Sequence, residues 1–119
     1  MEGAHMKPNF DQVLKIKNDR RTIEAGGPCN WDPDDRSAEI KDVMVEQPGV
    51  IASSGTTSTT VQRGDDSWWL DATSSRQFAT GPARVRAVAF VTKTNGTVQE
   101  YPWPDYVELG ETSGQYAGS

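Results

Sequence analysis

Apolar and polar residues alternate in short segments along most of this chain. The alternation is most regular in 67–73, where Trp68 and Leu70 share one face and Trp69 lies on the other. Period-two alternation is typical of β-strands that bury one face, so we expect Trp68 and Leu70 in the core and Trp69 at or near the surface. Nowhere do apolar residues recur at helical spacing for three turns, so helix is expected to be a minor component.

The same alternation predicts a series of strands separated by residues that favour turns. The expected strands are 13–17, 22–24, 38–46, 50–53, 57–62, 67–73, 83–93, 97–101 and 106–109. Turns are expected where glycine, proline and aspartate gather, as in Gly26-Gly27-Pro28. Asn95-Gly96 is the preferred pair for a two-residue type I′ turn, so it predicts a tight hairpin after strand 83–93.

Two expected strands depart from simple alternation. In 38–46, Ile40 falls on the opposite face from Val43 and Val45, and a bulge near Asp42 would bring all three onto one face. In 83–93, one face carries small apolar residues and is expected in the core. The other face is apolar around Phe90, which indicates that another segment or a partner covers it.

Few residues suited to catalysis are present. His5 is the only histidine, and it lies in 1–6, a segment typical of an expression-vector remnant. Without it, catalytic triads that need histidine and metal sites with histidine ligands are excluded. We therefore expect no enzymatic activity and no cofactor. Cys29 is the only cysteine, and a plain buried or half-buried thiol is expected. A reactive nucleophile and an intermolecular disulfide are the alternatives for it.

The charge of the chain narrows the choice of partners. The formal net charge is −5, which argues against nucleic acid as a partner. Basic residues between Lys7 and Arg21 are interrupted by aspartates and are expected on an edge strand, with an anion-binding arm as the alternative. Between Glu24 and Asp66 the acidic residues outnumber the basic ones, so one surface is expected to be acidic. No apolar run approaches the length that crosses a bilayer, so no membrane insertion is expected.

The run from Gly81 to Ala89, followed by the Asn-Gly hairpin, resembles the last strands of immunoglobulin-like and fibronectin-type sandwich domains of bacterial surface and secreted proteins. The resemblance extends at most over 50–109, and the paired cysteines of antibody domains are missing. It implies an all-β fold, an antiparallel, immunoglobulin-like β-sandwich of about seven to nine short strands. We expect 1–6 to be the vector remnant, 7–109 the single domain and 110–119 a flexible tail.

Exposed aromatic residues are the main candidates for a binding site. Four tryptophans are present, a high density for a small domain. They could form a platform for a sugar or a Pro-rich peptide, or serve only as core residues. The candidate binding residues are Trp69, Trp103, Tyr101 and Phe90, with Trp31 and Tyr106 as further members of the platform.

The turn around Asp32, Asp34 and Asp35 offers oxygen ligands of the kind that calcium prefers. It lacks the central glycine and the final glutamate of an EF-hand loop. We therefore expect a solvated turn and no metal site, with these three aspartates as weak candidates, which Asp65 and Asp66 could join.

Together these features predict a non-enzymatic binding or structural module of a larger surface, secreted or phage-associated protein. One alternative is a small carbohydrate-binding module that uses exposed aromatic residues. Another is an acidic inhibitor or immunity-type protein that masks a basic site through 24–66. The expected partner is a protein or a carbohydrate. The oligomeric state and the compartment stay open, although an extracellular or cell-surface place is favoured.

Overall fold

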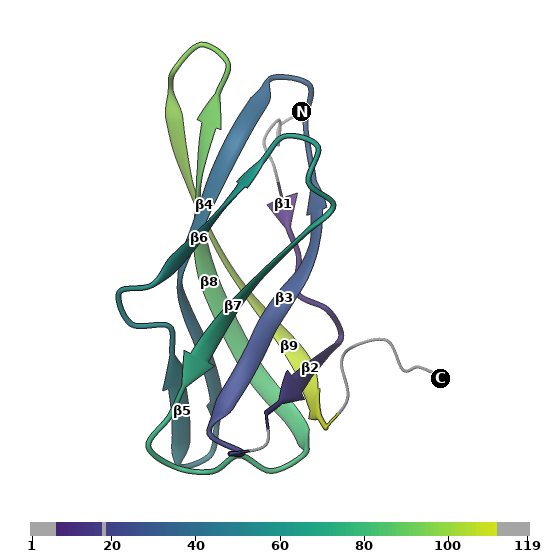
Figure 1. Ribbon diagram of the computed structural model, residues 1–119, viewed down its shortest axis with the longest axis vertical. Coiled ribbons are helices and arrows are strands. Elements are labelled where there is room, and N and C mark those ends of the chain that lie inside the picture. Colours follow the sequence, from purple (N-terminus) through teal and green to yellow (C-terminus); the bar gives the residue numbers. More distant parts are fainter. Residues whose placement is uncertain (1–6, 18, 112–119) are drawn as a thin grey trace.

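The computed structural model describes residues 7–17 and 19–111, which form nine β-strands and no helix (Figure 1). The all-β expectation is confirmed, and no helix in this part of the chain is long and apolar enough to span a membrane. The strands are β1 (Lys7–Pro8), β2 (Val13–Ile16), β3 (Thr22–Asn30), β4 (Asp35–Gln47), β5 (Val50–Ser53), β6 (Ser58–Gln62), β7 (Ser67–Thr73), β8 (Gly81–Lys93) and β9 (Val98–Gly110).

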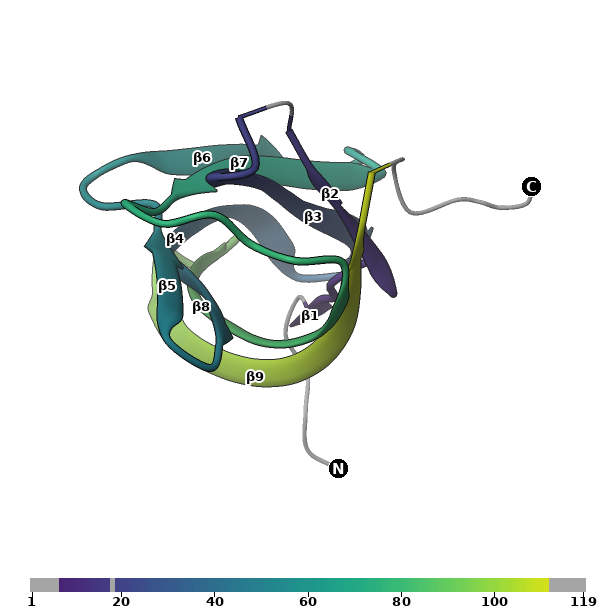
Figure 2. The same cartoon turned by 90° about the horizontal axis from the view of Figure 1, so that it is seen from below.

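The expectation of an antiparallel, immunoglobulin-like sandwich is wrong, because the strands close into a barrel. Seven strands form a ring in the order β3, β2, β9, β8, β4, β5, β7 and back to β3 (Figure 2). The sheet is mixed, since β2 runs parallel to β9, with Val13 opposite Glu108. The remaining two strands extend this ring, β1 along β3 and β6 along β4. Pairing between strands from the two ends of the chain thus joins edges that a sandwich would leave open.

The ring has two narrow seams. The parallel contact of β2 with β9 consists of three residue pairs, from Val13 opposite Glu108 to Lys15 opposite Gly110. The contact of β5 with β7 consists of the single pair Ser53 and Thr73. By contrast, β8 pairs with β9 continuously from Gly81 to Thr92. The long strands therefore form the body of the barrel, and short pairings close it.

The segment Gly26-Gly27-Pro28 lies inside β3, and the expectation of a turn there is wrong. Gly26 and Gly27 pair with Trp69 and Trp68 of β7. A Cβ on Gly26 would lie 2.6 Å from the carbonyl oxygen of Trp68, and a Cβ on Gly27 would overlap the carbonyl of Asn9. These glycines are required by the close approach of neighbouring backbone and not by a change of chain direction.

The bulge expected near Asp42 is confirmed. The register of β4 against β8 shifts between Lys41 and Met44, and Asp42 has a φ of 56°. As a result Ile40 and Val43 both point into the core with no exposed surface. The hydroxyl oxygen of Ser54 accepts a hydrogen bond from the Val43 N–H at 3.0 Å, which satisfies a buried donor at the bulge.

Four residues, 94–97, connect β8 to β9, and the expected two-residue type I′ turn is wrong. The Gly96 N–H donates to the Lys93 carbonyl at 2.9 Å, and Gly96 has a φ of 90°. Asn95 is not in the left-handed region that a type I′ turn requires. Its side-chain oxygen instead accepts hydrogen bonds from the N–H and the hydroxyl of Thr97, which stabilises the wider loop.

The core contains an aromatic cluster of Phe10, Trp68 and Trp103. Trp68 is 3% exposed and Trp69 is 60% exposed, so the face assignment of this strand is confirmed. Phe10 lies 5.4 Å from Trp68 and 5.3 Å from Trp103 between ring centroids. Trp103 stands opposite the small Ala87 in the register of β8 and β9, and is itself buried.

Ordered structure extends slightly beyond the domain boundary expected at residue 109. Gly110 belongs to β9, and the carboxylate of Glu111 lies 2.8 Å from the guanidinium of Arg20. The expected vector remnant 1–6 and the rest of the expected tail, 112–119, lie outside the described residues.

Candidate binding surface

The outer surface of three neighbouring strands, β4, β8 and β9, carries a continuous series of depressions. We call it the arginine–proline face. It comprises Ile51 of the adjacent β5 and these residues of β4, β8 and β9: Met44, Glu46, Arg84, Arg86, Val88, Pro102, Pro104 and Tyr106. Three depressions of about 720, 390 and 270 Å³ lie on it. The smallest shares Glu46, Ile51 and Arg84 with the largest, and Met44, Arg86 and Pro104 with the third. The depressions therefore form one trough.

The strand register arranges this face in rows across the sheet. Arg84 stands between Glu46 and Tyr106. Two residues further along β8, Arg86 stands between Met44 and Pro104. Because alternate residues of a strand share a face, the two arginines lie on the same side of β8, flanked by apolar side chains from β9. The face thus offers guanidinium donors beside exposed apolar surface.

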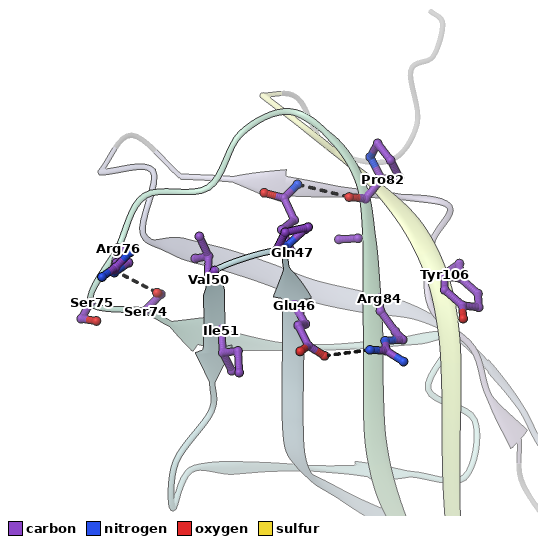
Figure 3. A pocket seen from close by; sticks show the side chains of 13 residues that line it. Glu46, Gln47, Val50, Ile51, Ser74, Ser75, Arg76, Pro82, Arg84 and Tyr106 are labelled. Atoms are coloured by element: carbon purple, nitrogen blue, oxygen red, sulfur yellow. Dashed lines mark hydrogen bonds and ion pairs between the residues drawn. The ribbon is translucent and has the colours of Figure 1, made fainter.

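The largest depression surrounds the β4–β5 hairpin at one end of the barrel (Figure 3). Arg76 lies on one side of the hairpin and Arg84 on the other, with Val50 and Ile51 between them. The side-chain amide of Gln47 donates to the carbonyls of Ala79 and Pro82, and its oxygen accepts from the Ala79 N–H. These bonds hold the loop between β7 and β8 against the hairpin and fix the shape of the depression.

The edge of β9 that faces away from β8 lacks free donors beside this trough. The Glu108 N–H donates to the Gln12 carbonyl on the β2 side, so the nitrogens of residues 102, 104 and 106 also face away from β8. Pro102 and Pro104 have no N–H. The Tyr106 N–H donates a hydrogen bond to the Asp105 carboxylate at 2.8 Å. This edge therefore resists pairing with another strand.

The structure separates the four aromatic candidates. Trp69 is exposed on the outer face of β7. Trp103 is 7% exposed, so its expected place on a surface platform is wrong, and Tyr101 is stacked on it at 6.0 Å with an interplanar angle of 12°. Phe90 is half-buried on β8, and the Lys41 ammonium lies 5.6 Å from its ring centroid. A single shared aromatic platform is therefore not formed.

The three aspartates considered for calcium belong to a turn held by two basic side chains. The Lys93 ammonium lies 2.5 Å from Asp35 and 3.2 Å from Asp34, and Asp35 is completely buried. Arg63 donates to the carbonyls of Asp32 and Asp35. Burial opposes the charge of Lys93, but hydrogen bonds and charge from the two aspartates outweigh it and raise its pKa. The ammonium group thus occupies the place beside these carboxylates that a cation would take.

Cys29 lies on β3 and is half-buried. Burial, with smaller effects from the carboxylates of Asp65 and Asp66, raises the pKa of its thiol to about 11. A thiol with such a high pKa is almost entirely protonated at neutral pH, and the thiolate is the nucleophilic form. The environment of Cys29 therefore favours the plain thiol over a reactive nucleophile.

The main residues of the arginine–proline face were not among the binding residues expected from the sequence. Arg84 and Arg86 alternate with buried Val85 along β8, and Pro102 and Pro104 alternate with buried Trp103 along β9. Both spacings place like residues on one outward face, and this signal was available in the sequence. β8 and β9 are brought side by side because they form the two arms of one hairpin.

Comparison of the sequence with models of protein families and with curated proteins gives no match.

Proposed function

We propose that this chain is a non-enzymatic binding module that recognises a protein partner through the arginine–proline face. The observation that carries the proposal is the continuity of the three depressions across β4, β8 and β9. An open trough along a sheet suits an extended polypeptide segment, whose side chains alternate at the same spacing as those of the strands beneath it. The module is proposed to be part of a larger surface, secreted or phage-associated protein.

The chemistry of the face favours a partner segment that combines acidic and apolar side chains. The chain as a whole has a net charge of −5, yet this face presents Arg84 and Arg86. The Arg84–Glu46 contact is long, at 3.5 Å, and both side chains are largely exposed, so it competes weakly with a ligand carboxylate. Arginine also binds carboxylates with two parallel hydrogen bonds. Ile51 and Tyr106, both exposed, provide apolar contact area beside the arginines.

The acidic-inhibitor alternative has less support. Several acidic residues of the segment 24–66 have partners within the protein: Asp34 and Asp35 bind Lys93, and Asp65 accepts the Gln62 N–H. Glu46 belongs to the arginine–proline face and lies near Arg84. Partnered and dispersed carboxylates attract a basic protein less strongly than an unpaired cluster does.

The proposal is tested by selecting displayed random peptides on the immobilised domain. We expect enriched sequences with acidic and apolar residues at alternate positions. Reversal of both charges in Arg84→Glu/Arg86→Glu should weaken the binding of a selected peptide at least about tenfold, as truncation of a central contact does. The matched control is Arg21→Glu/Arg36→Glu, which changes the net charge equally at exposed arginines outside the face.

Two results would contradict this function. One is equal weakening by both charge-reversal variants, which would show that net charge alone drives peptide binding. The other is reproducible turnover in a broad hydrolase and transferase screen that disappears when one carboxylate is replaced. Such turnover would mean that the chain is an enzyme.

A further inference from the structure

A fourth depression lies on the outside of the barrel, next to the exposed Trp69. It has a volume of about 370 Å³ and is bordered by β2, β3 and β7. Among the residues that line it are Trp69, Gly26, Lys15, Glu24 and Asp66. We call it the tryptophan groove. It shares no residue with the arginine–proline face.

The groove exists because β3 has no side chain beside the indole. Gly26 is the register partner of Trp69, and paired residues of neighbouring strands project on the same face of a sheet. A Cβ on Gly26 would lie 2.6 Å from the Trp68 carbonyl oxygen and 3.2 Å from the Trp69 Cβ, so no larger residue fits. The indole is left 60% exposed above a floor of backbone. This is a fixed hollow with an aromatic wall.

Polar groups surround the hollow on the sides away from the indole. Glu24 and Lys15 are register partners on β3 and β2, and Asp11, Asp66 and Ser67 also line the groove. Partial burial raises the pKa of the Asp11 carboxyl. The carboxylates accept hydrogen bonds and the ammonium group of Lys15 donates them. The groove therefore combines one apolar aromatic surface with donors and acceptors on its borders.

We propose that the tryptophan groove binds a saccharide ring. A pyranose has one face of C–H groups, which stacks on an aromatic surface, and hydroxyl groups around its edge, which bond to carboxylates and an ammonium group. The volume of the groove is at the lower end for ligand pockets, which suits one or two rings of a longer chain. This site is independent of the peptide surface proposed above.

The test is a titration of the ¹⁵N-labelled protein with cellotetraose, chitotetraose and maltotetraose, followed through the indole N–H signals. We expect at least one sugar to move the Trp69 signal while the signals of the buried Trp68 and Trp103 stay in place. Trp69→Ala should weaken binding of that sugar at least about tenfold. Tyr106→Ala is the matched control, because Tyr106 is an exposed aromatic residue on the arginine–proline face and should leave the affinity unchanged.

The outcome also separates a sugar from a cation at this site. Tetramethylammonium and an oligoarginine peptide would bind an indole flanked by carboxylates through cation–π contact. A larger shift of the Trp69 signal with either cation than with every sugar would overturn the proposal, as would the absence of any shift at millimolar sugar. Retained sugar binding by Trp69→Ala, with the Tyr106→Ala variant weakened instead, would place the sugar on the other face and also overturn it.

Discussion

At the scale of single residues, the consecutive Trp68 and Trp69 show how strongly β-strand geometry decides the role of a side chain. Trp68 is 3% exposed, packs against Phe10 and donates its indole N–H to the Asn9 carbonyl at 3.0 Å. Trp69 is 60% exposed and lines the tryptophan groove. Period-two alternation is sufficient to predict this difference from the sequence.

Truncation of the two tryptophans is expected to have very different effects on stability. Trp68→Ala removes a buried aromatic side chain and should lower the free energy of unfolding by about 3–5 kcal/mol. Trp69→Ala removes an exposed side chain and should cost within about 0.5 kcal/mol. Urea denaturation followed by circular dichroism measures both. Equal losses would show that the face assignment of β7 is incorrect.

The buried Lys93–Asp35 ion pair makes stability depend on alkaline pH. The pKa of Lys93 is raised above its ordinary value of 10.5, because hydrogen bonds with Asp35 and Asp34 outweigh the cost of burial. A raised folded-state pKa stabilises the protein fully below about pH 10.5, and this stability is lost as pH rises through the folded-state pKa. We expect the free energy of unfolding to fall above about pH 10.5.

The pH dependence is checked by urea denaturation between pH 8 and pH 12. Asp35→Leu/Lys93→Met replaces the buried pair with apolar residues and should have a smaller loss over this range. Asp35→Ala alone leaves the buried ammonium without its main partner and should cost about 3–5 kcal/mol at neutral pH. An identical pH profile in the double variant would contradict the assignment to Lys93.

At the scale of elements, the local sequence pattern predicts where strands lie. It does not predict which residues from other strands pack against them. The ranges 50–53 and 67–73 are predicted to the residue, and the bulge at Asp42 follows from the misplaced Ile40. The segment Gly26-Gly27-Pro28 misleads, because glycines required by close backbone contact have the same composition as a turn. The burial of Trp103 was not predicted, because it depends on contact with Phe10, which lies in no predicted strand.

The prolines of β9 are expected to keep the molecule from associating through its sheet edge. Pro102→Thr/Pro104→Thr would restore two N–H donors on the edge that faces away from β8. Exposed donors on an edge strand are a template for pairing with another chain. We expect the double variant to form dimers or larger species in analytical ultracentrifugation at concentrations where the parent protein does not.

A control for this experiment is Pro48→Thr, because Pro48 lies in the β4–β5 turn and not on a sheet edge. Its sedimentation should match that of the parent protein. If the double variant also sediments like the parent, the edge is protected by something other than the prolines.

At the scale of the whole molecule, closure of the barrel requires residues from both ends of the chain. β2 near the N-terminal side meets β9 near the C-terminal side, with Leu14 opposite Leu109. A sequence pattern that shows which residues form strands contains no information on this distant parallel pairing. For that reason the all-β class was predictable and the barrel was not. The trough depends on three strands coming together, so it was predictable only in part.

Distant pairing is expected to make refolding slow and cooperative. Contacts of high sequence separation are formed only after a large loss of chain entropy, so we expect a refolding time of about milliseconds to seconds. Tryptophan fluorescence and far-UV circular dichroism should report the same rate, because Trp68 and Trp103 reach their buried positions when the sheet closes. A circular-dichroism phase that is complete well before the fluorescence change would show that the strands form before the barrel closes.

The parallel pairing of β2 with β9 also determines how the barrel responds to mechanical force. A pull on the chain before Val13 and after Gly110 draws these two strands in opposite directions along their own axes. The hydrogen bonds of a parallel pair are evenly spaced along the strands, so they bear such a load together and must be sheared at once. An antiparallel hairpin pulled at its open end loses its bonds one after another. The seam that closes this barrel is therefore arranged to resist extension along the polypeptide.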